Sequence, residues 1–160
     1  MVSLYVLVVS FAGLRLAGFL GVKRLNQLSE CLRYSFAVMF IFTGVSHFTA
    51  LKDDFVRMIP FEALRNEYTV YFTGVIEIGG ALWLAWGGYI KFVCLLLILF
   101  LLAVLPANIY ASLNDIPIGG RAPTEMYTRI SVQALYIVLL AYVGWGEHFK
   151  ERISGMGARG

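Results

Sequence analysis

The sequence predicts an all-α membrane protein, a polytopic bundle of five transmembrane helices in a single domain. Hydrophobic residues make up 59% of the 160-residue chain and charged residues only 14%, whereas soluble domains carry roughly a quarter charged residues. The mean hydropathy is +0.76, and a soluble domain of this size could not bury so much apolar surface. The apolar residues also fall into five runs, each close to the roughly 20 residues that a spanning helix needs.

The first three helices are expected at residues 2–22, 32–48 and 69–89. The first run is interpreted as a retained helix because its positive charges, Lys23 and Arg24, follow the apolar segment, whereas those of a signal peptide precede it. The second and third helices are separated by a polar connector. Its segment Met58–Phe61 is too short to span but is suited to the membrane interface.

The last two helices are expected at residues 92–109 and 130–145, followed by a polar, mobile tail at 147–160. The short connection Gly87–Lys91 predicts that the third and fourth helices are antiparallel neighbours.

The linker from 111 to 128 has a loop-like composition. Pro106 cannot donate a hydrogen bond to the Leu102 carbonyl, so a kink is expected just before Asn108.

Basic residues are distributed unevenly between the two predicted ends of the bundle, seven on the side of the C-terminus and five on the other. Because cytoplasmic segments carry more Lys and Arg, we expect an outside N-terminus and a cytoplasmic C-terminus, in a bacterial cytoplasmic membrane. The first group is Lys23, Arg24, Arg33, Lys91, Lys150, Arg152 and Arg159, and the second is Lys52, Arg57, Arg65, Arg121 and Arg129.

Glu77 lies near the middle of the third predicted helix, YFTGVIEIGGALWLAW. A carboxylate at this depth costs a few kcal/mol to insert, so it is expected to face protein or a wet cavity. Thr73, Gly74 and Ala81 share its face of the helix, and small residues let neighbouring helices approach closely. A carboxylate in mid-membrane is a candidate functional group.

Further polar residues are expected at the outer end of the bundle, where they would form the mouth of a lipophilic cavity above Glu77. Each has a structural alternative: His47 could cap its helix, Asn108 could bond the carbonyl that Pro106 leaves free, and Arg129 could be an interface anchor. The predicted cavity residues are His47, Glu77, Asn108, Arg129, Gln133, Met58 and Pro60.

Arg15 is an unusual charge within the first apolar run. At about 1.5 Å per residue it would lie roughly 20 Å deep and Glu77 roughly 13 Å deep, so a long guanidinium could bridge most of that gap. Arg15 is therefore a candidate partner for Glu77, and snorkelling toward the Lys23 end is the alternative.

Other kinds of site are disfavoured. The net charge of +3 comes from residues scattered between apolar runs, so no nucleic-acid surface is expected. No metal site is expected, because His47 and His148 would lie on opposite sides of the membrane. Cys31 and Cys94 are isolated, without a CxxC pattern that would indicate a thiol relay.

Five short motifs, in order along the chain, resemble the DoxX-like family of small membrane proteins. They are Thr43–Phe48, Met58–Pro60, Thr73–Ala81, Leu105–Tyr110 and Arg129–Gln133, and the resemblance extends from about Leu32 to Trp145.

The resemblance implies a four-helix bundle with one added N-terminal helix. It also implies an accessory subunit of a membrane-linked redox or assembly system, holding a lipophilic ligand such as a quinone or lipid, or a protein partner. The alternatives are a quinone-linked oxidoreductase with Glu77 and His47 as proton-handling groups, and a small transporter. Membrane lipid, a protein partner and a second copy of the chain are the partners considered. The chain lacks the paired cysteines of thiol-oxidising membrane bundles, which argues against a disulfide mechanism.

Overall fold

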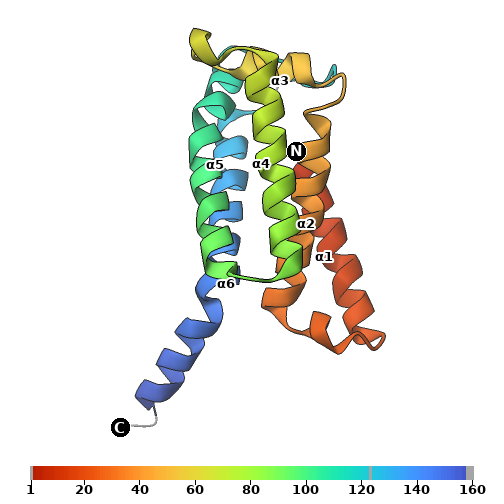
Figure 1. The fold of residues 1–160 in the computed structure, drawn as a ribbon, viewed down its shortest axis with the longest axis vertical. Coiled ribbons are helices and arrows are strands. Elements are labelled where there is room, and N and C mark those ends of the chain that lie inside the picture. Colours follow the sequence, from red (N-terminus) through yellow and green to blue (C-terminus); the bar gives the residue numbers. More distant parts are fainter. Residues whose placement is uncertain (1, 123, 158–160) are drawn as a thin grey trace.

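Five long helices run roughly side by side in the computed structural model (Figure 1). They are α1 (Val2–Phe19), α2 (Leu28–Ser46), α4 (Glu67–Trp86), α5 (Ile90–Leu113) and α6 (Met126–Gly157). Each has a segment long and apolar enough to cross a membrane, which confirms the predicted all-α bundle of five spans. The structure describes residues 2–122 and 124–157, with side chains described as far as Gly146.

The helices do not contribute equally to the core. Half of the membrane segment of α2 is buried, compared with 11% of that of α1. Helices α2, α4, α5 and α6 form the central bundle, and α1 packs mainly on α2 from outside. The core is built from large apolar side chains of these helices, including Phe36, Phe40, Leu84, Leu97 and Leu140.

Short helical segments join the spans. At the end containing the α1–α2 connection lies η1 (Lys23–Asn26), and at the opposite end α3 (Lys52–Met58) and η2 (Glu62–Leu64) connect α2 to α4. Helix α3 lies across the top of the bundle in Figure 1. We call these the η1 end and the α3 end.

The tight turn between α4 and α5 agrees with the prediction of antiparallel neighbours. Helix α4 begins at Asn66, whose side chain accepts a hydrogen bond from the Thr69 backbone N–H, and it ends at Gly87. Gly87 has φ +86°, a left-handed conformation that glycine adopts without steric cost. Residue Ile90 then begins α5 in the opposite direction.

Two helices are longer than the sequence predicted. Helix α5 continues through Pro106 to Leu113. Helix α6 begins at Met126 and continues to Gly157, where a polar tail was expected. Within a membrane every backbone N–H and C=O group needs a hydrogen-bond partner. A helix that continues past the apolar run supplies these partners up to the membrane surface and beyond it. Near Pro106 the Gln133 side chain donates a hydrogen bond to the Leu101 carbonyl.

Helices α2 and α4 cross at two glycines. A Cβ atom at Gly74 would lie 2.7 Å from the His47 Cβ and 3.0 Å from the Gly44 carbonyl oxygen. A Cβ at Gly44 would lie 3.0 Å from the Gly74 carbonyl oxygen and 3.1 Å from the Glu77 Cβ. The two backbones can touch only because both residues lack a side chain, as in other close helix contacts within membranes.

We therefore expect Gly74→Ala to destabilise the protein by about 1–3 kcal/mol, since the added methyl group would force the helices apart. Gly79, on the same helix, is the matched control because a Cβ there meets nothing within 4 Å. Unfolding of both variants in detergent measures the difference. Equal stability of the Gly74→Ala and Gly79→Ala proteins would contradict the role of the crossing.

Candidate functional site

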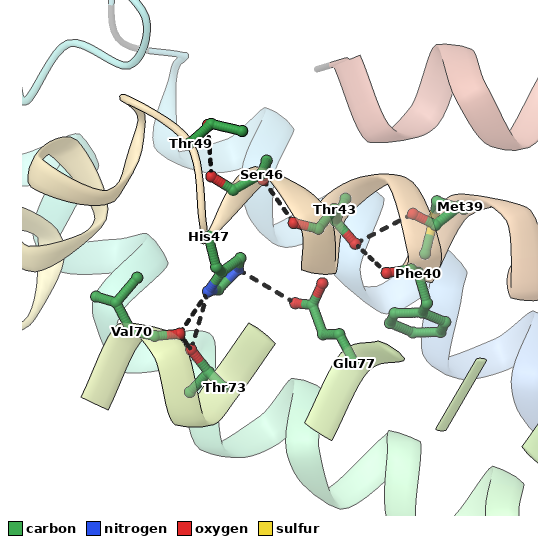
Figure 2. A network of polar contacts seen from close by, with 9 residues as sticks. All are labelled: Met39, Phe40, Thr43, Ser46, His47, Thr49, Val70, Thr73 and Glu77. Atoms are coloured by element: carbon green, nitrogen blue, oxygen red, sulfur yellow. Dashed lines mark hydrogen bonds and ion pairs between the residues drawn. The ribbon is translucent and has the colours of Figure 1, made fainter. Parts of the chain in front are cut away.

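The crossing of α2 and α4 brings His47 and Glu77 together. His47 Nε2 lies 3.7 Å from Glu77 Oε1, and the two side chains are only 13% and 11% exposed. Figure 2 shows the imidazole at the end of α2 directed toward the carboxyl group on α4. Two of the predicted cavity residues thus form one buried pair, and His47 does more than end its helix.

The two helices contribute matching segments to this pair. Thr43-Gly44-Val45 precedes His47 in α2 at the same spacing at which Thr73-Gly74-Val75 precedes Glu77 in α4. Each glycine lies against the Cβ of the other helix's ionisable residue. The antiparallel crossing is therefore locally two-fold in character. The contact between His47 and Glu77 could have been predicted from this repeated Thr-Gly-Val pattern in the sequence.

The orientation of the His47 ring is fixed by its other nitrogen. Nδ1 lies 2.9 Å from the Val70 carbonyl oxygen and 3.0 Å from the Thr73 hydroxyl oxygen. The carbonyl can only accept, so we assign the Nδ1 proton to that contact. In the neutral ring Nε2 then presents a lone pair to Glu77.

This assignment determines how many protons the pair holds. Without a shared proton, the carboxylate would face the imidazole lone pair and leave a buried negative charge. With two protons on the pair, a buried imidazolium would lack a counter-charge. One proton, on either Nε2 or the carboxyl, gives no net charge, and burying a net charge is the costly state.

The second carboxyl oxygen of Glu77 is left incomplete. Oε2 is buried and has no hydrogen-bond partner among the described residues. The Thr43 hydroxyl lies beside the carboxyl group and is also within hydrogen-bonding distance of the carbonyl oxygens of Met39 and Phe40, at 3.1 and 3.4 Å. A buried polar atom without a partner is costly.

A second polar pair joins α5 to α6. Asn108 Nδ2 donates to Gln133 Oε1 over 3.1 Å, and Gln133 is only 4% exposed. Arg129 does not join them. Its Nε donates to the Thr124 carbonyl at 3.3 Å, and it has no acidic partner in the described part of the chain.

Helix α3 contacts the site through a residue that the sequence did not single out. The Phe55 ring lies 4.7 Å from the His47 ring, centroid to centroid. Met58 is buried at the end of α3 and Pro60 is half-buried in the connector beyond it. The Phe55 ring therefore covers the His47 ring. The sequence did not indicate this contact, because a seven-residue helix is too short to show an apolar periodicity.

Arg15 does not pair with Glu77 and follows the alternative instead, extending toward the Lys23 end. Its guanidinium donates to the Asn26 carbonyl at 2.8 Å and lies over the Phe19 ring. Helix α1 packs on α2, so Arg15 extends instead to the η1 end, as long basic side chains near helix ends commonly do.

Arg33 is a buried charge that the sequence did not indicate. It is 2% exposed and donates to Glu30 Oε2 at 2.8 Å and to the Leu84 carbonyl at 2.6 Å. Glu30 also accepts from Arg24 at 2.7 Å. A Cβ at Gly87 would meet Arg33 Nη1 at 2.5 Å, so the α4–α5 turn is built around this guanidinium.

An apolar groove of about 100 Å³ lies between α4 and α5. It is lined by Ile76, Gly80, Trp83, Val93, Leu96 and Leu97. None of these was among the predicted cavity residues, although Ile76 is adjacent to Glu77 in the chain. The groove lies on the α5 side of α4, whereas Glu77 faces α2.

These features define a class: a small polytopic helical protein with a buried histidine–glutamate pair at one end of its bundle. The chain belongs to a family described as a domain of unknown function (DUF8561), whose family model matches residues 36–143. The match includes the α2–α4 crossing and both polar pairs. No curated protein and no solved structure matches the chain.

His47 and Glu77 should be energetically coupled. In a double-mutant cycle with His47→Gln and Glu77→Gln, we expect a coupling of about 0.5–3 kcal/mol in unfolding free energy, the range for residues in contact.

Arg15→Met is the control for this cycle, because Arg15 bonds elsewhere. Its effect should add to that of Glu77→Gln within about 0.5 kcal/mol. A larger coupling of Glu77 to Arg15 than to His47 would refute the assigned pair.

Proposed function

We propose that this chain is an accessory, ligand-binding subunit of a membrane-linked redox or assembly system, and that the His47–Glu77 pair is its proton-handling site. The ligand is lipophilic and reaches the pair from the membrane. The resemblance to DoxX-like proteins agrees with this proposal and suggests a distant relationship. The associated partner would be another membrane subunit or a second copy of the chain.

The observation that supports this function is the incomplete hydrogen bonding of Glu77. Its Oε2 is buried without a partner, while Oε1 lies against His47. A purely structural carboxyl in a membrane would be expected to satisfy both oxygens. Here one oxygen remains for a ligand, next to a proton that can move between two side chains.

A quinone fits the chemistry of this pair. Its carbonyl oxygens accept hydrogen bonds, and the protonated member of the pair is a donor. Glu77 and His47 would hold it, and a bound quinone would supply the electron-transfer chemistry. The chain's own residues would orient the carbonyl group and keep a proton available. Thr73 and the Val70 carbonyl would maintain the imidazole orientation that this requires.

The second candidate is that the chain is itself a quinone-linked oxidoreductase. The proximity of His47 to Glu77 favours it, because an acid and a base in contact can exchange a proton with a reacting group. Turnover of a short-chain quinol by the purified chain alone, with an added electron acceptor, would favour this alternative. Binding without turnover would favour the accessory role.

We expect a lipophilic molecule, close to one per chain, to copurify with the protein in mild detergent. Glu77→Gln and His47→Gln should lower its occupancy at least about tenfold, as losing one charged hydrogen-bond partner would. Glu62→Gln is the matched control, because Glu62 is an exposed carboxylate outside the bundle core. Extraction and mass spectrometry measure the occupancy. Equal occupancy in all four proteins, or no bound molecule, would refute the proposed function.

The chain is proposed to lie in a bacterial cytoplasmic membrane with the α3 end outside. Apart from Arg15, Lys and Arg residues number seven at the η1 and C-terminal side and five at the α3 end, and Arg15 itself extends to the η1 end. This imbalance favours a cytoplasmic η1 end. The His47–Glu77 pair would then lie toward the outer leaflet.

A reporter fused after Gly160 should therefore be active in the cytoplasm, and one inserted at Asn114 should be active outside. Paired cytoplasmic and periplasmic reporters at each position make the measurement. The reverse result at both positions would invert the orientation, and the same result at both would contradict α6 as a span.

A further inference from the structure

Helix α3 covers the His47–Glu77 pair at the α3 end of the bundle. Its Phe55 ring lies 4.7 Å from the His47 ring, tilted by 32°. In Figure 1 the helix lies across the ends of α2 and α4, and His47 is the C-terminal cap of α2. Phe55 therefore covers part of the His47 ring at this end.

One polar contact fastens the start of α3 to α4. Lys52 Nζ donates to Glu67 Oε2 at 2.8 Å and to the Tyr71 hydroxyl at 3.3 Å. Glu67 and Tyr71 together hold the pKa of Lys52 above its ordinary value, so this contact retains its charge at neutral pH. The Tyr71 ring in turn stacks on Phe48, which follows His47 in the chain.

A second polar contact fastens α3 to the loop between α5 and α6. Asp54 Oδ2 accepts a hydrogen bond from the Gly119 backbone N–H at 2.7 Å. Its other oxygen pairs with Arg57 one turn later in the same helix. Gly119 has φ +59°, and this left-handed conformation directs its N–H at Asp54 in a way that few other residues would allow.

We infer that α3 is a lid over the His47–Glu77 pair, held closed by the Lys52–Glu67 and Asp54–Gly119 contacts, and that its opening admits the ligand from the outer leaflet of the membrane. A seven-residue helix is too short to be stable by itself. Both contacts that hold this helix are partly exposed. In the first, the Lys52 and Glu67 side chains are 30% and 50% exposed. Segments held by exposed polar contacts open more readily than the core. The entry of a ligand rests on the proposed function, but the opening of α3 does not.

Chemical modification of His47 in the ligand-free, detergent-solubilised protein tests the lid. The chain has two histidines, so a His148→Ala background without a histidine tag leaves His47 as the only histidine that diethyl pyrocarbonate can modify. Mass spectrometry gives the rate. We expect Lys52→Gln and Asp54→Asn each to raise it about three- to tenfold, as loss of one fastening shifts the opening equilibrium. Phe55→Ala should raise it further.

Two controls separate lid opening from general unfolding. Asp53→Asn changes the neighbouring exposed carboxylate and should leave the rate unchanged. Cys31 and Cys94 are both fully buried in the bundle, so their thiols should stay unreactive in the lid variants. Reaction of His47 and both thiols at the same increased rate would overturn the lid, and so would unchanged modification in the Lys52→Gln and Asp54→Asn proteins. If the lid variants raise the modification rate of His47 as expected but no lipophilic molecule copurifies, the lid is supported and the proposed function is refuted.

Discussion

The contact between Gly44 and Gly74 is the constraint on which the rest of the structure depends. It sets how closely α2 and α4 approach, because a methyl group at either position would collide with the opposite backbone or with a site residue. At this separation the residue three positions after each glycine lies against the opposite glycine. One of these is His47 and the other is Glu77. The same spacing brings Val70 and Thr73 within hydrogen-bonding distance of the imidazole.

Polar side chains in this bundle mostly serve the backbone. His47 contacts the Val70 carbonyl, Gln133 donates to that of Leu101 and Arg33 to that of Leu84. The hydrocarbon core contains no water that could hydrogen-bond to these carbonyl groups, so each polar side chain within it needs a partner in the protein. Three buried atoms among the described residues lack one: Glu77 Oε2, Arg33 Nε and Trp83 Nε1. Only the first belongs to a pair that can share a proton.

The sequence determined the fold more fully than the site. Length and hydropathy of each apolar run sufficed for the five spans, because the thickness of the bilayer permits few alternatives. Glu77 could be identified by its depth alone. Its partner could not, because partner choice depends on how each helix is rotated and on which helices touch. Arg15 had the right charge but lies on α1, which packs against α2.

Charge alone is a poor marker of exposure in this bundle. Arg33 follows Glu30 by one helical turn, and this spacing neutralises both within the bundle. The segment after Trp145 is rich in charged residues, yet α6 continues through it to Gly157. Phe55 was missed for a different reason: a single aromatic residue in a short connector has no periodicity to interpret.

The two ends of the bundle show why one carboxylate is a structural contact and the other a candidate site. At the η1 end Glu30 is held by two guanidinium groups, Arg24 and Arg33, at 2.7 and 2.8 Å. Arginine does not lose its proton in proteins, so this contact is permanent. At the α3 end the ionisable partner of Glu77 among the described residues is an imidazole at 3.7 Å, a group that exists both with and without its second proton. A contact that can lose its proton is a poor structural anchor but a suitable site for binding and releasing a proton.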